Sequence, residues 1–113
     1  MDKELLKQQV CAAIDASAAK IKAIADGIAD EPELGFKEVK TSAKVAEFMR
    51  ELGLDVQTGL AINGVKGRAH GCKPGPTAAV LGELDAVGCP ESAKADPLTG
   101  AAHACGHNLQ IAT

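Results

Sequence analysis

Apolar residues near the start of the chain recur three, four or seven positions apart, which is the spacing of one face of an amphipathic helix. These residues are Leu5, Leu6, Val10, Ile14, Ile21, Ile24 and Ile28. Charged and polar residues occupy the positions between them. The pattern predicts a helix from about Asp2 to Ala29, which ends before Pro32 because the residue ahead of a proline avoids the α region.

A second helix is predicted from Lys37 to Leu52, followed by Gly53 where a left-handed cap is expected. Its apolar face comprises Val45, Phe48, Met49 and Leu52. After Gly53 the period changes, and the residues from Leu54 to Leu60 and from Val65 to Ala69 are typical of short strands.

The run from Thr77 to Leu84 is nearly all apolar, which is typical of a strand buried on both faces of a central sheet. From Asp85 onward the pattern indicates loop, and the chain ends on Leu109 to Thr113, the apolar start of an unfinished element. Two helices followed by strands predict an α/β fold. We interpret residues 1–113 as an incomplete part of one domain, with no complete second domain.

The composition of the 113 residues is that of a globular protein, with 46% hydrophobic and 24% charged residues. Only 2% are aromatic, so the core must consist of aliphatic side chains and is expected to be thin. The net charge of -3, without a Lys/Arg cluster, argues against nucleic acid or an anionic membrane as partner. The start of the chain lacks the apolar stretch of a signal peptide, so we expect a cytoplasmic protein whose cysteines are thiols or ligands.

The clearest candidate for chemistry is the block 103–108, His-Ala-Cys-Gly-His-Asn. In extended backbone, Cys105 and His107 would point to the same side and could bind one ion, and thiolate with imidazole suits Zn²⁺. The alternatives are a glycine-containing loop with an incidental thiol, and a catalytic thiol at Cys105 with His103 or His107 as its base. A structural zinc site of Cys72, Cys89, Cys105 and His107 would lack the usual Cys-x-x-Cys spacing.

A second candidate lies at the end of the apolar run, where Glu83 and Asp85 are two positions apart and could face one cleft. Catalytic groups favour the carboxyl ends of strands in open α/β sheets, and carboxylates commonly orient metal-binding histidines. Solvated carboxylates at a strand end are the alternative.

Together these segments closely resemble one family. The segments are 31–36 (EPELGF), 51–53 (ELG), 74–77 (PGPT), 82–86 (GELDA) and 103–108 (HACGHN). Their order is similar to that of the aminoacylase/carboxypeptidase-type metallopeptidases, and in particular to the amidohydrolase branch. That branch includes N-acyl-amino-acid, indole-acetyl-amino-acid and p-aminobenzoyl-glutamate hydrolases. The resemblance covers about residues 31 to 113.

The resemblance implies a catalytic domain that holds two divalent metal ions, with Zn, Mn or Co as the candidates. By matching position, Cys105 and His107 would be metal ligands and Asp85 would orient the metal centre. Glu83 stands where relatives outside the branch have a histidine ligand. With His103 and Asn108, it is expected to contact and orient the ligands.

The implied activity is metal-dependent hydrolysis of an amide bond in a small molecule such as an N-acyl amino acid, aminobenzoyl-glutamate or a dipeptide. The family's glutamate base and its remaining ligands would lie beyond Thr113. We therefore expect the 113-residue chain alone to be inactive, and to be either a self-associated homo-oligomer or a loosely packed monomer. The alternative function is a non-catalytic metal- or ligand-binding module derived from such an enzyme.

Overall fold

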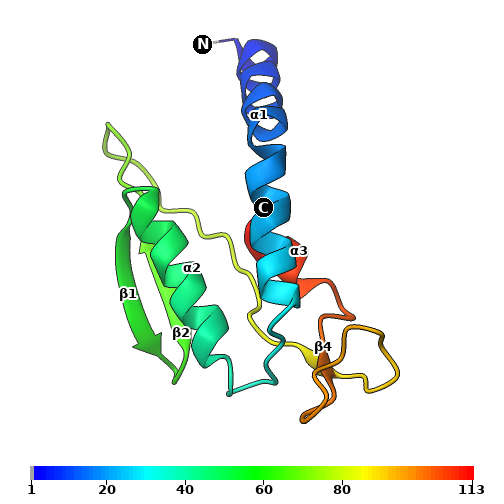
Figure 1. The fold of residues 1–113 in the computed structure, drawn as a ribbon. Helices are drawn as coiled ribbons and strands as arrows, with labels where there is room; N and C mark the ends of the chain where they lie inside the picture. The colour runs from blue at the N-terminus through cyan, green and yellow to red at the C-terminus, as the bar shows by residue number, and fades with distance from the viewer. Residues whose placement is uncertain (1) are drawn as a thin grey trace.

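A computed structural model describes residues 2–113 and shows an elongated molecule of 51 × 29 × 20 Å (Figure 1). The elements in order are α1 (Lys3–Ala29), α2 (Val39–Glu51), β1 (Asp55–Leu60), β2 (Gly64–Arg68), β3 (Val87–Gly88), β4 (Ala101–Ala102) and α3 (His107–Ala112). The radius of gyration is 16.0 Å, against about 13 Å for a compact domain of this length. The excess comes from α1, whose first half projects beyond the other elements.

The first predicted helix is confirmed, and its start is set by a side-chain cap. The Asp2 carboxylate accepts a hydrogen bond of 3.0 Å from the main-chain N–H of Glu4. The helix ends at Ala29, ahead of Pro32, as the sequence predicts.

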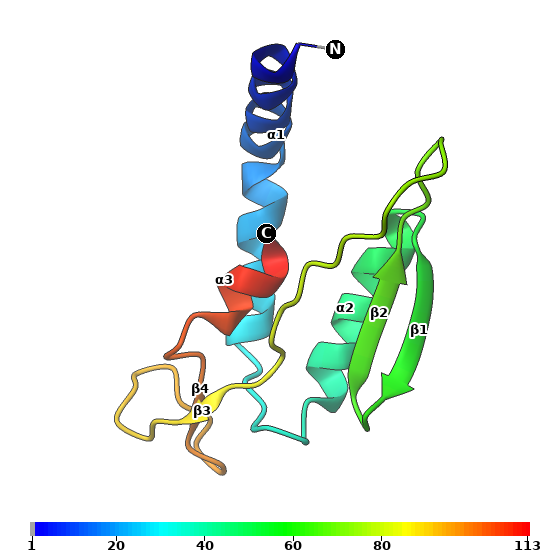
Figure 2. The ribbon, with the colours of Figure 1, turned by 180° about the vertical axis from the view of Figure 1, so that it is seen from behind.

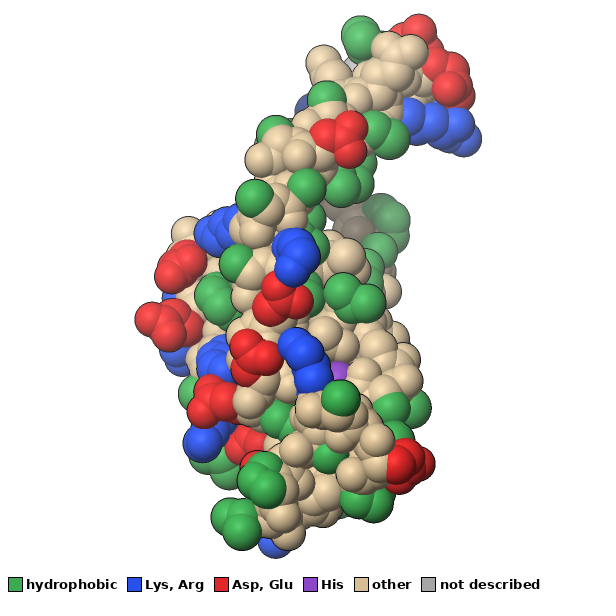
Figure 3. Space-filling model, turned by 45° about the vertical axis from the view of Figure 1, so that its right-hand side comes forward, with side chains coloured by type: hydrophobic (Ala, Val, Ile, Leu, Met, Phe, Trp, Pro, Cys, Tyr) green, Lys and Arg blue, Asp and Glu red, His purple; other side chains and the backbone are tan. Residues whose placement is uncertain are grey.

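The apolar stripe of α1 is covered only at its C-terminal end. Ala25 and Ile28 are buried, but Leu6, Val10 and Ile14 are about half exposed. Figure 3 shows hydrophobic side chains along the projecting part of the helix. The first half of α1 therefore depends on its cap at Asp2, its alanine content and local ion pairs such as Glu4–Lys7, since no other described element packs on it.

The second predicted helix is also confirmed, and its N-terminus is capped by Glu33, a residue of the preceding loop. Glu38 makes no side-chain cap. Instead the Glu33 carboxylate accepts hydrogen bonds from the main-chain N–H groups of Lys40 and Thr41, at 3.0 and 2.8 Å, and from the Thr41 hydroxyl at 2.9 Å. The helix is followed by Gly53 with φ of +75°, the left-handed conformation expected there.

The two predicted strands after Gly53 are confirmed as an antiparallel pair, β1–β2, with Asp55 opposite Arg68. Helix α2 packs on this sheet, and Met49 and Leu54 contact the position of Gly67 so closely that a Cβ there would lie 2.8 Å from the Met49 sulfur. In the connecting turn, Ala61 and Ile62 have φ of +45° and +85°, which is strained backbone for non-glycine residues.

The strand predicted from Thr77 to Leu84 is wrong for this chain. The segment runs without regular secondary structure between the α2–β2 unit and the α1–α3 unit (Figure 2). Val80 is 100% and Leu81 88% exposed. A central strand requires neighbours that pair with both of its edges, and residues 2–113 form only two separate two-stranded sheets.

The expectation of loop from Asp85 onward misses two short strands, whereas the element expected to start near Leu109 is found as α3. Strands β3 and β4 pair antiparallel, with Val87 opposite Ala102, and α3 packs against α1. The C-terminus lies beside the middle of α1 in both ribbon views. The fold class, a mixture of helices and small sheets, agrees with the predicted partial α/β domain, although the described residues form no continuous central sheet.

The core is thin, as the composition predicts. The buried hydrophobic residues are mostly alanines: Ala25, Ile28, Val45, Ala46, Ala86, Ala101 and Ala102. Of the two phenylalanines, Phe36 is 72% exposed and Phe48 half-buried.

Among the described helices, none combines the length and apolar character needed to cross a membrane.

Candidate metal centre

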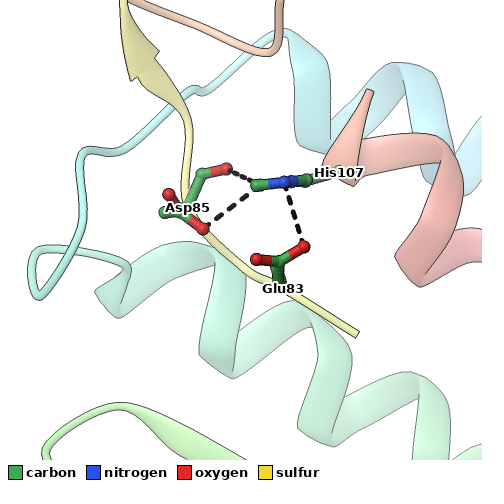
Figure 4. A group of neighbouring side chains, drawn as sticks. All are labelled: Glu83, Asp85 and His107. Atoms are coloured by element: carbon green, nitrogen blue, oxygen red, sulfur yellow. Dashed lines mark hydrogen bonds and ion pairs between the residues drawn. The ribbon is translucent and has the colours of Figure 1, made fainter. Parts of the chain in front are cut away.

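Three side chains from two distant segments converge beside α3. Glu83 and Asp85 lie at the end of the extended segment, and His107 is the first residue of α3. One potential ligand atom from each residue lies within 4.8 Å of the other two. Figure 4 shows the His107 ring between the two carboxylates.

Backbone contacts on two sides hold the carboxylate-bearing segment in place. The main-chain N–H of Ala86 donates to the carbonyl oxygen of Glu33 at 2.8 Å, and Leu34 forms an isolated parallel bridge with Ala86. On the other side, the main-chain N–H of Glu83 donates to Oε1 of Gln110 at 2.8 Å. Nothing in the sequence signals that Glu33 and Gln110 take these positions, because both contacts depend on tertiary structure.

The orientation of His107 follows from the hydrogen bonds of its two ring nitrogens. Nδ1 lies 2.8 Å from the carbonyl oxygen of Asp85 and 3.2 Å from its carboxylate Oδ1. Nε2 lies 3.1 Å from Oε2 of Glu83. The hydrogen bond to the Asp85 carbonyl raises the pKa of His107, and the charges of Glu83 and Asp85 act in the same direction while partial burial opposes them. The His107 ring is 16% exposed, whereas the side chains of Asp85 and Glu83 are 35% and 62% exposed, so Glu83 is the most accessible member of the group.

His103 lies half-buried near this group, without a hydrogen-bond partner for either ring nitrogen among the described residues. Burial lowers the pKa of His103, the neighbouring His107 lowers it further, and Asp85 acts against both. The ring is therefore favoured as neutral imidazole. An unsatisfied buried nitrogen is unfavourable by roughly 1–3 kcal/mol, so this position suits a bound water, ion or substrate group.

The remaining predicted site residues lie outside the three-residue group. Cys105 is exposed and lies in a turn, so the extended backbone assumed for its pairing with His107 is absent. Asn108 is buried, and its side-chain amide donates to the carbonyl oxygen of Ala25 at 3.1 Å, which ties α3 to α1. The alternative structural zinc site is not formed, since no group within residues 2–113 brings Cys72 and Cys89 together with Cys105 and His107.

The donor chemistry of the group fits a divalent metal ion. Carboxylate oxygens and an imidazole nitrogen are established ligands of Zn²⁺ and of neighbouring divalent ions. The carbonyl of Asp85 can only accept, so Nδ1 carries the hydrogen and Nε2 is the nitrogen available to a metal. A histidine fixed in this way by a carbonyl or carboxylate is the usual arrangement at protein metal centres.

Comparison with known proteins supports the same class. The chain is 38% identical over 89 residues to "Thermostable carboxypeptidase 2" of Saccharolobus solfataricus, covering 75% of this chain and 23% of that protein. It is 31% identical over 93 residues to "N-acetylcysteine deacetylase" of Bacillus subtilis, covering 74% and 23%. It is 32% identical over 84 residues to "IAA-amino acid hydrolase ILR1-like 4" of Arabidopsis thaliana, covering 72% and 19%.

The fold and the three-residue group define a mixed α/β protein with a candidate metal centre. The relatives confirm the resemblance to the aminoacylase/carboxypeptidase-type hydrolases and their amidohydrolase branch. The matched region spans about a fifth to a quarter of the length of these curated relatives. No protein-family model matches the chain, and no solved structure matches it significantly.

Proposed function

We propose that this sequence contributes part of the metal centre of an amidohydrolase that cleaves an amide bond in a small molecule. The observation that carries the proposal is the convergence of Glu83, Asp85 and His107, since it places an oriented imidazole between two carboxylates. The names of the relatives, a carboxypeptidase, an N-acetylcysteine deacetylase and an IAA-amino acid hydrolase, support an amide as the bond cleaved. The substrate would be an N-acyl amino acid, aminobenzoyl-glutamate or a dipeptide.

The residues of this chain would hold and orient the ion. His107 would offer Nε2, Asp85 would fix the ring through Nδ1, and Cys105 would approach from the turn before Gly106 as the second ligand that the family resemblance implies. A bound divalent ion supplies Lewis acidity, which activates water and polarises the amide carbonyl. Two ions of Zn, Mn or Co, a cytoplasmic location and homo-oligomerisation remain parts of this proposal.

The proposal includes the inactivity of the 113-residue chain on its own. Catalytic zinc sites usually combine three protein ligands with an open position, and two-ion centres need more. Within residues 2–113, the side chains form one group of three possible metal ligands, namely Glu83, Asp85 and His107. The general base is worth roughly 10²–10⁴-fold in rate, and the family resemblance places it outside this sequence.

The test compares the 113-residue chain with a longer protein that contains it. Both are saturated with Mn²⁺ or Zn²⁺ and assayed with N-acyl amino acids, aminobenzoyl-glutamate and dipeptides. We expect metal-dependent hydrolysis by the longer protein, lost on His107→Ala, and none by the short chain above its Cys105→Ala control. Hydrolysis that survives both chelation and His107→Ala in the longer protein would refute the amidohydrolase proposal. Metal binding without hydrolysis in the longer protein would favour the non-catalytic binding module.

A further inference from the structure

We infer that the projecting half of α1 is a docking surface for a second copy of this chain, which pairs with it in antiparallel orientation. The surface is the exposed apolar stripe of α1, with Leu6, Val10 and Ile14 at its centre. The inference does not depend on the proposed hydrolase activity. It assigns an interface to the self-association that the sequence led us to expect.

The apolar stripe runs along the whole of α1, but its two halves have different surroundings. Toward the C-terminal end, where α1 contacts α3, Ile24 is half-buried and Ile28 is buried. Val10 and Ile14 lie in the half that projects beyond the other elements, and they are 51% and 53% exposed (Figures 1 and 3). A helix face with this apolar spacing is typical of a surface that packs on another element.

The charges beside the stripe make the surface complementary to itself. Asp2 and Lys20 are 18 residues apart, and so are Glu4 and Lys22. Because 18 residues are five helical turns, Asp2 and Lys20 lie on one side of the stripe, and Glu4 and Lys22 lie on the other. Each side therefore carries a carboxylate near the N-terminus and an ammonium group about 27 Å further along the helix. Reversing the helix direction brings opposite charges together on both sides.

These charged groups are all accessible to a second copy. Lys20 is paired with Glu51 at 3.6 Å and Lys22 with Asp26, and both lysine side chains are exposed. Glu4 is likewise exposed in its pair with a neighbouring lysine. Exposed ion pairs contribute little to stability, so exchanging them for contacts between two copies costs little.

Antiparallel alignment with Val10 of one copy opposite Ile14 of the other satisfies both the apolar and the charged parts of the surface. The two stripes then pack on each other along the projecting halves of the helices. Glu4 lies within one helical turn of Lys22 of the second copy, and the acidic and basic residues on the other side meet in the same way. Because the pairing is two-fold symmetric, every contact occurs twice and the assembly closes as a dimer.

A parallel pair of the same helices lacks this complementarity. Lys3 and Lys7 border the stripe near the N-terminus, and in a parallel pair each would face its own counterpart. Like charges that face each other across an interface oppose association. In the antiparallel pair, moreover, the remaining elements of the two copies lie at opposite ends, so only the projecting helix halves have to meet (Figure 1).

The experiment measures self-association of the 113-residue chain by sedimentation equilibrium, with far-UV circular dichroism to verify the fold. EDTA is present so that metal bridging cannot contribute. A single helix pair is smaller than the interfaces of stable dimers, which bury roughly 1,200–2,000 Å², so we expect a dissociation constant on the order of 10–100 µM.

Two matched variants locate the surface. Ile14→Lys places a charge in the apolar contact at a position that is 53% exposed in the free chain, and it should weaken association at least about tenfold. Val80→Lys makes the same kind of change at a fully exposed apolar residue of the extended segment and should leave association unchanged.

Charge exchange tests the antiparallel alignment. Glu4→Lys and Lys22→Glu each bring like charges together in their own dimers, so each variant alone should associate about five- to tenfold more weakly than the unchanged chain. An equimolar mixture of the two restores both ion pairs in a mixed dimer, and it should associate about as strongly as the unchanged chain.

Several results would overturn the inference. They are a chain that stays monomeric at concentrations well above about 100 µM, dimers that tolerate Ile14→Lys or are lost in Val80→Lys, and a mixture of charge variants that associates no more strongly than its components. None of these results bears on metal-dependent hydrolysis, so the proposed function is tested separately.

Discussion

The Nδ1 atom of His107 lies 2.8 Å from the main-chain carbonyl oxygen of Asp85, so the backbone, as well as the Asp85 side chain, orients the imidazole. The carboxylate Oδ1 is the more distant partner at 3.2 Å. Because a substitution cannot remove the carbonyl, ring orientation and side-chain charge at residue 85 can be tested separately.

The first prediction is that Asp85→Asn keeps the ring orientation of His107 but weakens metal binding by about 10–100-fold, the usual cost of losing a group that contacts a metal ligand. The carbonyl still accepts from Nδ1, while the nearby negative charge is gone. NMR of the imidazole nitrogens should show the same tautomer, and calorimetry the lower affinity. Asp55→Asn, at an exposed position on β1, serves as the control. Equal affinities of the Asp85 variant and the unchanged chain would contradict a role for this carboxylate.

Gly106 provides the second prediction, because it precedes His107 with φ of +81°. A side chain in this left-handed region is unfavourable by roughly 1–2 kcal/mol. Gly106→Ala should lower the free energy of unfolding by about that amount and reduce metal affinity by displacing His107. Gly27→Ala, within α1 and without a positive φ, should instead stabilise the chain by about 0.5–1 kcal/mol. Urea denaturation measures the free energy of unfolding of both variants. An unchanged value for Gly106→Ala would show that the turn accommodates the side chain without cost.

The third prediction concerns the cap that Glu33 provides for α2. Three hydrogen bonds from Lys40 and Thr41 end on its carboxylate, and Glu38 supplies no substitute. Glu33→Ala should lower the free energy of unfolding by about 1–2 kcal/mol, the range for loss of an N-cap. Glu47→Ala, at an exposed position of the same helix, should change it by less than about 0.5 kcal/mol. Similar values for the two variants would show that the cap does not stabilise the fold.

The fourth prediction is a pH dependence that arises at Asp96, in the loop between β3 and β4. Hydrogen bonds from the main-chain N–H and hydroxyl of Thr99, at 2.8 and 3.0 Å, and from the N–H of Leu98, at 2.9 Å, hold the pKa of Asp96 below its ordinary value. Because the pKa of Asp96 is lower in the folded state, ionised Asp96 stabilises the fold fully at pH values above its unfolded-state pKa of about 3.9. This stabilisation is lost as the pH falls through the lower pKa of the folded state.

Carbon NMR of the Asp96 carboxyl should therefore show titration below the ordinary aspartate range. Thermal unfolding between about pH 5 and pH 2 should show a smaller pH dependence in Asp96→Asn than in the unchanged chain. Titration of Asp96 at or above the ordinary value would contradict the turn geometry.

The elements that the sequence predicted correctly are those whose cause is local. The seven-residue spacing of Ile14, Ile21 and Ile28 favours a helix through local periodicity, and Gly53 marks a helix end through its own φ. The β1–β2 pair follows from two short strands close together in sequence. For this reason residues 2–68 agree closely with their predicted elements.

Tertiary structure decided the rest. The apolar composition of Thr77–Leu84 is that of a buried strand, but strand formation requires hydrogen-bonding neighbours, and residues 2–113 supply none for this segment. From the sequence by itself, we also identified Glu83, Asp85, Cys105 and His107 as candidate residues of a metal site. It could not decide which of them meet, because the same-face pairing of Cys105 with His107 assumes extended backbone. A turn at Cys105 and the left-handed Gly106 replace that backbone with the start of α3, and the packing of α3 on α1 brings His107 to Glu83 and Asp85 instead.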